Sequence, residues 1–286
     1  MLVFITSLRH PQNSSDYRKV EHLLARTLNS VCAQTDNRFQ VIVVCNQIPS
    51  DIPTFTNVHY VKVGFPAPSE ANQARTGMSA VLKDKGTKYV ISLKKAEEFN
   101  PEYVMFFDAD DYLHKDIAGF VNTHPGENGW YVDKGFVYRD GGLLISETDH
   151  FNQVCGSSHI LKFDLLRQPD AVTLNASQDS IMELIDHEFL FSVLGGHRKI
   201  TAWFSERNLP LKAFPYAAAI WLTNTGENHS GVSFFGLPSI LSAKIKADFN
   251  LRPPEGVGIW IKELFILYPF YCIKSLLRYF KHKLVK

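Results

Sequence analysis

Two apolar runs near the N-terminus, separated by a helical pattern, strongly limit the folds that this chain can adopt. Residues 2–7 and 39–45 read as strands, and the second run is an almost unbroken series of β-branched residues. Between them, residues 16–33 carry apolar side chains at helical spacing. A strand, a helix and a strand of these lengths form a βαβ unit, so we predict a buried parallel sheet.

The same pattern continues through the first hundred residues and then becomes less regular. Apolar runs at 58–63 and 104–107 predict two more strands, and the segments 70–83 and 86–100 have helical spacing. Beyond residue 113 we expect strands at 130–132, 135–138 and 217–222, a hairpin turn at 139–142, and a helix at 181–194. The predicted fold class is therefore α/β, with a mostly parallel central sheet flanked by helices.

Three carboxylates, Asp108, Asp110 and Asp111, follow the apolar run at 104–107 within four positions. Ligands of open α/β sheets bind at the carboxyl ends of the strands, so these acids lie where chemistry is expected. Asp108 and Asp110 share one side of a continuing strand or one turn, and either geometry lets both reach one cation. Oxygen ligands of this kind favour Mg²⁺ or Mn²⁺, the ions that bridge a carboxylate to a diphosphate.

Other interpretations of the acidic run are a helix cap, a calcium loop and a phosphatase motif. Asp111 could simply cap a helix over 113–120. An EF-hand loop would need a glycine and a closing glutamate that are absent at their spacing. A phosphatase of the haloacid dehalogenase type would need a threonine just downstream, where Asp111 and Tyr112 stand. We therefore favour a metal site.

Length and composition describe an ordinary globular protein. The 286 residues are 45% hydrophobic and 21% charged, enough for one large α/β domain with appendages. Thirty basic residues against 29 acidic residues give no global field, which argues against nucleic acid as a partner. The four cysteines are scattered, and the first residues lack the basic segment and long apolar run of a secretory signal. We expect a cytoplasmic protein with reduced thiols.

Two blocks of the sequence, taken together, carry a resemblance to a known family. Residues 26–35 (Arg-Thr-Leu-Asn-Ser-Val-Cys-Ala-Gln-Thr) precede the apolar strand at 39–44. Residues 74–77 (Ala-Arg-Thr-Gly) are followed by Phe-Phe-Asp-Ala-Asp-Asp at 106–111. In order and rough spacing these blocks resemble the GT-A glycosyltransferases of the family 2 type, over about residues 1–235. The chain departs from that family at Asn46, where an aspartate for the nucleoside is common.

The resemblance implies a Rossmann-like GT-A fold that binds a nucleotide-diphosphate sugar, with Asp108 and Asp110 around Mn²⁺ or Mg²⁺. It also implies that His229 completes the metal site. A carboxylate from Asp186 or Glu188 would take the proton of the acceptor hydroxyl, and the two alternatives stay open. Direct displacement in this arrangement predicts inversion at the anomeric carbon.

The donor and acceptor sites can be assigned to particular residues on the same basis. The residues expected to bind the nucleotide sugar are Thr6, Ser7, Asn46, Arg75, Lys85, Lys88, Asp108 and Ala109. Those expected to bind the acceptor are Trp130, Tyr131, Gly156, Ser157 and Ser158. The alternatives are that the two lysines are solvated on a helix surface and that Trp130 belongs to the core.

The last fifty residues change character. We predict a catalytic domain over 1–235, with a nucleotide-sugar half at 1–113 and an acceptor half at 114–235, and a helical tail at 236–286. The apolar run at 264–273 is interrupted by Pro269 and is too short to span a bilayer. Five basic residues follow it: Lys274, Arg278, Lys281, Lys283 and Lys286. The tail is therefore either a peripheral contact with the inner face of the cell membrane or a packing or dimer helix.

Together these features predict a metal-dependent glycosyltransferase that moves a sugar from a nucleotide-diphosphate donor to a hydroxyl of a saccharide or glycolipid acceptor. A role in polysaccharide biosynthesis follows from the tail and the resemblance. Two alternatives are a nucleotidyltransferase on a related sheet and a non-catalytic protein that binds nucleotides or sugars. The first would be expected to have a glycine-rich phosphate loop, which residues 6–10 lack.

Overall fold

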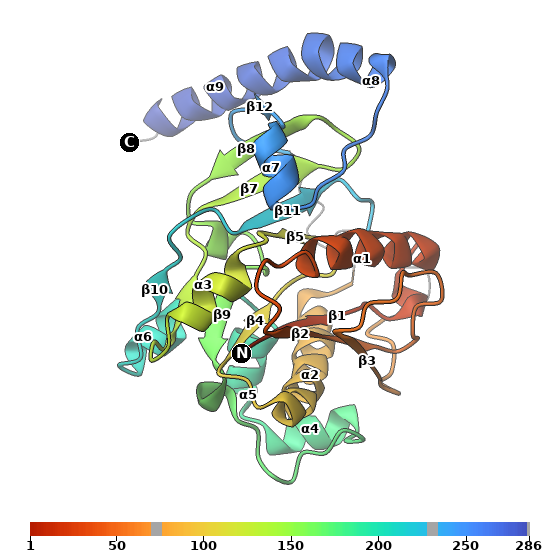
Figure 1. The fold of residues 1–286 in the computed structure, drawn as a ribbon, viewed down its shortest axis with the longest axis vertical. Helices are drawn as coiled ribbons and strands as arrows, with labels where there is room; N and C mark the ends of the chain where they lie inside the picture. Colours follow the sequence, from red (N-terminus) through yellow and green to blue (C-terminus); the bar gives the residue numbers. More distant parts are fainter. Residues whose placement is uncertain (70–75, 228–233, 285–286) are drawn as a thin grey trace.

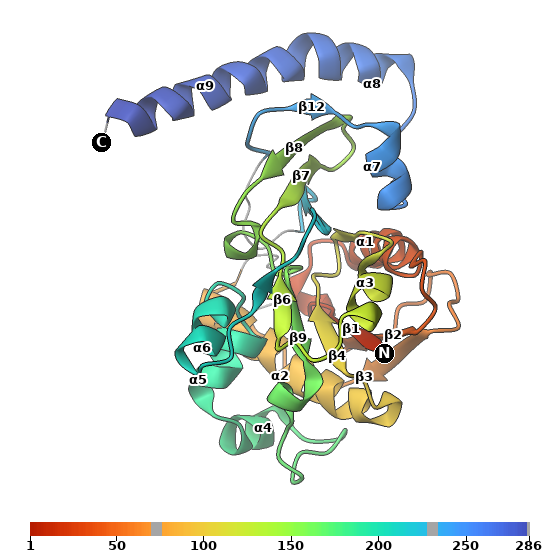
Figure 2. The ribbon, with the colours of Figure 1, turned by 60° about the vertical axis from the view of Figure 1, so that its left-hand side comes forward.

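The computed structural model describes residues 1–69, 76–227 and 234–284. It contains a larger and a smaller β-sheet, with helices packed around the larger one and a long helix at the C-terminal end (Figures 1 and 2). The predicted α/β class, the mostly parallel central sheet and the C-terminal helical tail are confirmed. Within the described part of the chain, no helix is long and apolar enough to cross a membrane.

The larger sheet has seven strands. In spatial order they are β10 (Lys212–Ala213), β6 (Gly129–Tyr131), β9 (His159–Lys162), β4 (Tyr103–Phe106), β1 (Leu2–Ser7), β2 (Phe39–Cys45) and β3 (Val58–Lys62). The pairs β3–β2, β2–β1 and β1–β4 are parallel, whereas β9 runs antiparallel to both β4 and β6. The βαβ unit predicted from the first 45 residues forms, and β4 lies beside β1 at the centre of the sheet.

The smaller sheet has five strands: β12 (Ser239–Ile240), β8 (Leu144–Thr148), β7 (Gly135–Arg139), β11 (Ala219–Thr223) and β5 (Tyr112–Leu113). Strands β7 and β8 form the predicted hairpin. Gly141 lies in its turn at φ +72°, a backbone conformation that favours glycine. Because β5 follows the acidic turn directly, the chain passes from the larger sheet to the smaller one at residues 108–111.

The helices are α1 (Tyr17–Val31), α2 (Met78–Ala96), α3 (Ile117–Thr123), α4 (Gln178–Leu184), α5 (His187–Phe189), α6 (Ile200–Glu206), α7 (Ala243–Asp248), α8 (Val257–Lys262) and α9 (Tyr268–Leu284). Two π-helical segments are η5 (Leu190–Leu194) and η6 (Glu263–Leu267), and short 3₁₀ turns are η1 (Pro11–Asn13), η2 (Glu97–Phe99), η3 (Phe151–Gln153) and η4 (Phe163–Leu166). Helix α1 begins after Asp16, whose carboxylate accepts a hydrogen bond from the Arg18 amide at 3.0 Å.

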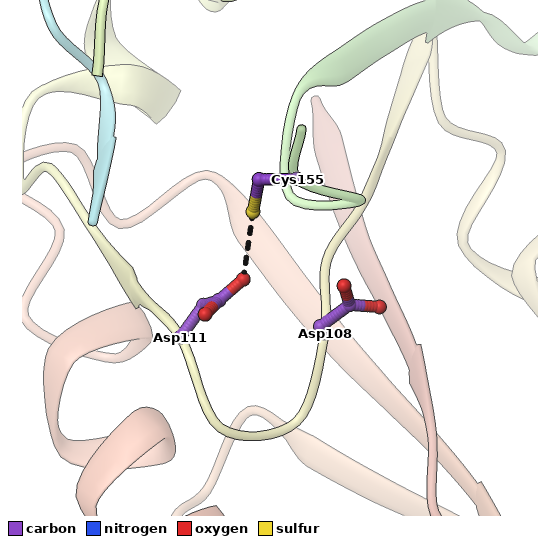
Figure 3. A group of neighbouring side chains, drawn as sticks. All are labelled: Asp108, Asp111 and Cys155. Atoms are coloured by element: carbon purple, nitrogen blue, oxygen red, sulfur yellow. Dashed lines mark hydrogen bonds between the residues drawn. The ribbon is translucent and has the colours of Figure 1, made fainter. Parts of the chain in front are cut away.

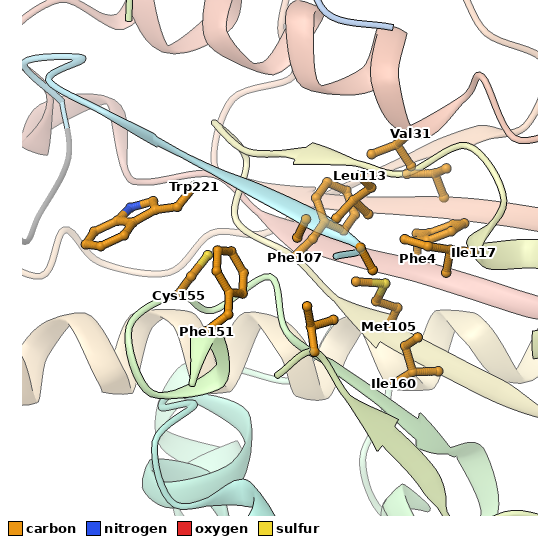
Figure 4. Packing of buried hydrophobic residues seen from close by; sticks show 14 of the residues in the cluster. Phe4, Val31, Met105, Phe107, Leu113, Ile117, Phe151, Cys155, Ile160 and Trp221 are labelled. Carbon is orange, nitrogen blue, oxygen red and sulfur yellow. The ribbon is translucent and has the colours of Figure 1, made fainter. Parts of the chain in front are cut away.

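Two apolar clusters cover the two faces of the larger sheet. Strand β1 sends Leu2 and Phe4 to one cluster and Val3 and Ile5 to the other, and none of the four is exposed. The first cluster contains side chains of α1 and α3 and reaches Trp221 on β11 (Figure 4). The second contains side chains of α2 and η5. A strand buried on both faces has no reason to alternate, which explains the continuous apolar runs in the sequence.

Helix α2 differs from the two separate helices expected at 70–83 and 86–100. It is one helix from Met78 to Ala96 that runs through Gly86, and residues 70–75 lie outside the described part of the chain. A Cβ atom on Gly86 would lie 2.9 Å from the carbonyl oxygen of Leu190 in η5. At the same crossing, a Cβ on Gly195 would clash with the Leu82 carbonyl. Gly86 lies inside α2 and lets η5 approach it closely, whereas Gly195 is the C-cap residue that ends η5 against α2.

Replacing Gly86 with alanine is expected to destabilise the protein by about 1–3 kcal/mol, because the new methyl group meets backbone atoms that have little room to move. Gly119→Ala is the matched control within a helix, since its Cβ would have an ordinary 3.7 Å contact. Helix propensity should make that variant neutral or up to about 1 kcal/mol more stable. Chemical denaturation of both variants checks the prediction, and an equal stability gain in the two would contradict the close crossing.

The helix expected at 181–194 is broken in the structure. Helix α4 ends at Leu184, and a second helical segment starts after Asp186, whose carboxylate accepts a hydrogen bond from the Phe189 amide at 2.7 Å. The second segment continues as η5 against α2. This local cap, together with the close crossing at Gly86, overrides the helical periodicity that runs through the whole segment.

The tail is attached to the smaller sheet at its start. Glu263 is buried, pairs with Arg139 of β7, and accepts a hydrogen bond from the Leu143 amide at 3.2 Å. Strand β12 and helix α7 precede this contact, and Asp248 of α7 pairs with Lys115 at 2.9 Å. Residues 236–250 therefore pack on the body of the protein, and the long helix begins only at Val257.

Candidate active site

Asp108 lies two residues beyond the end of β4, at the centre of the larger sheet. Its backbone amide donates a hydrogen bond to Ser157 Oγ at 2.8 Å, and its carboxylate pairs with the ammonium group of Lys85 on α2. Burial alone would raise the pKa of Asp108, but the Lys85 charge outweighs it and the pKa is lowered. Asp108 is therefore an ionised carboxylate just beyond the end of the central strand β4.

Gly156 brings a loop close to this carboxylate. A Cβ atom on Gly156 would lie 2.9 Å from Asp108 Oδ1, so any larger residue would push the acid away. The loop also contains Cys155, which lies beside Asp111 (Figure 3), and Ser157, whose hydroxyl group accepts a hydrogen bond from the Asp108 amide. Asp108 thus lies between the ammonium group of Lys85 on α2 and the backbone of Gly156, which has no side chain at the point of contact.

The Asp111 side chain points toward Cys155 (Figure 3). Its Oδ2 accepts hydrogen bonds from Ser157 Oγ at 2.6 Å and Cys155 Sγ at 3.0 Å. Its Oδ1 accepts one from the Leu222 amide of β11 at 2.9 Å. Asp111 is fully buried, and burial followed by the charges of the neighbouring acids raises its pKa well above the usual value. The interpretation of Asp111 as a helix cap is wrong: α3 begins at Ile117, and Asp111 joins two strands and a loop.

Ligand atoms of Asp108, Asp111 and Cys155 lie within 4.8 Å of one another, close enough to consider a metal site. Both oxygens of Asp111 are already engaged by donors. Cys155 is a thiol, because burial and then the Asp111 charge raise its pKa well above the ordinary value. A thiol that donates a hydrogen bond is a poor metal ligand, so this trio is better described as a hydrogen-bonded cluster.

Asp108 and Asp110 form a better donor pair for a divalent cation, since both line the same pocket. Burial, followed by the charge of Asp108, raises the pKa of Asp110 to about 7. Two carboxylates that repel each other in a buried site are stabilised when they share a cation. The oxygen donors present therefore fit Mg²⁺ or Mn²⁺. His229, the third expected ligand, lies outside the described residues.

The pocket has a volume of about 580 Å³. It is bordered by the ends of β1 and β4, by α1 and α2, and by the turn that follows η5. Four of the residues expected to bind the nucleotide sugar line it: Ser7, Lys85, Asp108 and Ala109. A pocket of this size can hold a small ligand of several rings, and it lies at the strand ends where α/β folds bind ligands.

Three other residues of the expected donor site point elsewhere. Thr6 is fully buried within β1, and the Asn46 amide group donates to the Phe65 carbonyl at 2.8 Å. Lys88 is also fully buried, with its ammonium group 2.7 Å from the Leu8 carbonyl and 2.8 Å from an Asp84 oxygen. Lys88 thus joins α2 to the end of β1 and is absent from the pocket lining. Arg75 lies outside the described residues.

Of the expected acceptor residues, Gly156 borders the pocket, whereas Ser157 and Ser158 are fully buried beneath it. Trp130 is 3% exposed and packs on Tyr103 with ring centroids 5.0 Å apart, so it belongs to the core. Tyr131 follows it on β6 and lies against the second apolar cluster. The aromatic pair of β6 is therefore part of the sheet's packing rather than of the pocket wall.

Neither expected base lies at the pocket. Asp186 caps α5, and Glu188 lies in the first turn of that helix; both are exposed and absent from the pocket lining. The expectation that one of them takes a proton in this pocket is therefore not supported by their positions. The break in the 181–194 helix is the physical reason, because it makes Asp186 a local cap on the protein surface.

The turn after η5 contributes residues that were not anticipated. Gly195 and Gly196 are followed by His197, Arg198 and Lys199, and all five border the pocket. His197 Nε2 is buried and has no hydrogen-bond partner among the described residues. Burial, followed by the charge of Lys85, lowers the pKa of His197 to about 4, so the imidazole is neutral at pH 7. A glycine pair followed by three basic residues was the signal in the sequence.

Arg9 and Glu227 form a second unanticipated part of the pocket wall. Arg9 Nη1 lies 3.0 Å from a carboxylate oxygen of Glu227, and the Ser15 and Asp16 amides donate to the other oxygen at 3.1 and 3.2 Å. Glu227 is 3% exposed. These contacts fasten the segment after β11 to the loop between β1 and α1, which closes one side of the pocket.

Comparison with known proteins gives similarity in fold only. No protein-family model matches the chain, and no curated protein matches its sequence. Solved structures similar to it include TarS from S. aureus (15% identity, TM-score 0.39, 79% of this chain and 37% of TarS). The WbbM bifunctional glycosyltransferase (16%, 0.28, 46% and 23%) and HddC from Yersinia pseudotuberculosis complexed with GMP-PN (13%, 0.34, 79% and 93%) are also similar. The chain thus spans well under half of TarS and of WbbM.

Proposed function

We propose that this protein is a GT-A-type glycosyltransferase that moves a sugar from a nucleotide-diphosphate donor to a hydroxyl of a saccharide or glycolipid acceptor. One observation carries the proposal: Asp108 and Asp110 follow the central strand β4 and line a 580 Å³ pocket beside Lys85. The motif resemblance over residues 1–235 supports the same assignment.

Asp108 and Asp110 are the proposed ligands of Mn²⁺ or Mg²⁺, with His229 as the proposed third. Bound there, the ion would supply Lewis-acid neutralisation of the charge that develops on a departing diphosphate. The chain adds positive charge of its own, because Lys85, Arg198 and Lys199 all border the pocket. Cationic groups fixed in place stabilise a charged leaving group without reorganising during the reaction. Arg75 remains a proposed further contact for the donor.

On the acceptor side, we propose direct displacement with inversion at the anomeric carbon. His197 is the proposed proton acceptor in place of Asp186 or Glu188, because its Nε2 is an unpaired, buried acceptor at the pocket. The causes that keep its ring neutral are burial and Lys85, so a lone pair is present at physiological pH. Gly156 and Trp221 border the same pocket and are proposed to contact the incoming saccharide.

The proposed location is the cytoplasm, at the inner face of the cell membrane, where a glycolipid or a growing envelope polysaccharide would present its hydroxyl groups. The apolar and basic composition of residues 257–286 supports this location. Reduced thiols agree with it, since Cys32, Cys45, Cys155 and Cys272 are all free in the structure.

Calorimetric titration with a panel of nucleotide-diphosphate sugars tests the donor site. In Mn²⁺ or Mg²⁺ we expect one donor to bind, with affinity reduced at least about tenfold by a chelator or by Asp110→Ala, because the diphosphate loses its cation. Glu188→Ala is the matched control, an acid that lies outside the pocket. If donor affinity changed neither on removal of the metal nor in Asp110→Ala, the assignment of Asp108 and Asp110 as metal ligands would be rejected. Binding of free sugar without nucleotide would favour a non-catalytic sugar-binding protein.

A further inference from the structure

Among the described residues, the exposed large apolar side chains are concentrated on the C-terminal helical segment formed by α8, η6 and α9. Fifteen large apolar residues are exposed among the side chains that the structure describes, and ten of them lie between residues 257 and 277. Phe265 is 76% exposed, and Leu277 is 65% exposed. A soluble monomer rarely exposes so many large apolar groups on one helix, so this face is expected to be covered by a partner.

The exposed face is not the result of a detached helix. On the opposite side of the same helix, Glu263 is 1% exposed and pairs with Arg139 of β7. Further along, in α9, Tyr271 packs on Phe234 with ring centroids 4.7 Å apart, and Ser275 Oγ donates a hydrogen bond to the Gly236 carbonyl at 2.6 Å. Figures 1 and 2 show the resulting helix lying across the end of the molecule, beyond the smaller sheet. Its outer face is therefore held in a fixed orientation.

The charge of the C-terminal segment indicates what kind of partner would cover this exposed face. From residue 264 to the end, the sequence has five lysines and arginines and no aspartate or glutamate. Glu263, the acid immediately before this stretch, is paired with Arg139. On the exposed side of residues 257–277, Lys262 is the one charged residue, whereas Trp260 and Tyr268 provide amphipathic rings. Apolar and aromatic residues with a basic flank are typical of helices that lie in the interface of an anionic bilayer.

A second copy of the chain fits this surface less well. Two such helices packed parallel to each other would bring like charges together, because the sequence has five basic residues and no acid from residue 264 onward. Like charges that face each other across an interface oppose association. A lipid surface supplies the compensating negative charge and also accepts exposed phenylalanine side chains.

We propose that α8, η6 and α9 form a docking face for an anionic lipid bilayer, with Phe265, Ile266, Phe270, Ile273 and Leu277 entering the interface. The helix lies in the membrane plane, held by the Glu263–Arg139 pair, and does not cross it. This inference deepens the membrane location given under the proposed function; because it uses no residue of the pocket, lipid binding and sugar transfer can fail separately.

Sedimentation of the full chain with lipid vesicles tests the docking face. We expect binding to vesicles of mixed phosphatidylcholine and phosphatidylglycerol, weaker binding to phosphatidylcholine alone, and loss of binding as salt increases. Phe265→Ser combined with Phe270→Ser should weaken binding at least about tenfold, because two large apolar groups no longer enter the lipid. The control is Ile48→Ser combined with Leu184→Ser, which removes exposed apolar groups elsewhere. We expect it to bind like the parent.

A second measurement keeps the test independent of stability. Brominated lipids should quench the fluorescence of Trp260, and Trp260→Phe should abolish most of this quenching while vesicle binding persists. Three results would overturn the proposal: no binding of the parent to anionic vesicles, equal binding by the tail and control variants, or a parent dimer that the tail variant converts to a monomer without any lipid binding.

Discussion

Replacing Asp111 with alanine should lower the free energy of unfolding by about 3–5 kcal/mol, because two strong donors lose their buried acceptor. The Leu222 amide and the Ser157 hydroxyl lie 2.9 and 2.6 Å from its two oxygens. Neither can reach water in its place, since Asp111 and Ser157 are fully buried. The midpoint of thermal unfolding should fall by roughly 6–15 °C.

The matched control is Asp170→Ala, an exposed aspartate for which a change within about 0.5 kcal/mol is expected. Asp111→Asn should fall between the two, because an amide oxygen can still accept from Leu222 while its NH₂ group faces the hydroxyl donor. Calorimetry or denaturant titration measures all three. A stability of Asp111→Ala equal to that of Asp170→Ala would show that Asp111 does not join the two sheets.

Replacing Asp108 with asparagine should reduce transfer or donor hydrolysis at least about a hundredfold at saturating Mn²⁺, because a charged oxygen at the leaving group is lost. Stability should change less, by about 1–3 kcal/mol, because the partly exposed ammonium group of Lys85 loses its partner. Turnover of a bound nucleotide sugar, with the thermal midpoint measured on the same samples, separates the two effects.

Adding Lys85→Met to Asp108→Asn sharpens this prediction. The double variant removes the unpaired charge, so most of the lost stability should return while activity stays low. If activity returned together with stability, Asp108 would act only by holding Lys85 and the proposed chemistry would be wrong. Asp170→Asn should leave turnover unchanged, which controls for the loss of an acid in general.

Strands β1 to β4 of the larger sheet could be predicted because their signal is local. Nearly all residues of 2–7, 39–45 and 104–107 are buried, on both faces of the sheet, so their apolar character is visible without knowledge of any partner. The end of β4 could be placed at the acids for the same reason. Helix boundaries were less predictable: Gly86 resembles a helix end in sequence but lies inside α2, where η5 approaches it.

The candidate site was predictable only in part, because the roles of polar residues depend on distant contacts. Lys85 and Lys88 are both lysines of one helix, yet Lys85 faces the pocket and Lys88 is buried against Asp84. His197 reaches the pocket because two glycines let η5 pack closely on α2. Such a contact joins segments more than one hundred residues apart, and no local periodicity encodes it.

By itself, the sequence determined a buried parallel sheet with acids at the end of a central strand, since a continuous apolar run is a property of neighbouring residues. The tertiary structure decided which acid does what. Asp108 and Asp110 line the pocket. Both carboxylate oxygens of Asp111, in contrast, accept hydrogen bonds from β11 and the 155–157 loop. The physical reason is that hydrogen-bond satisfaction in a buried site depends on groups that only folding brings together.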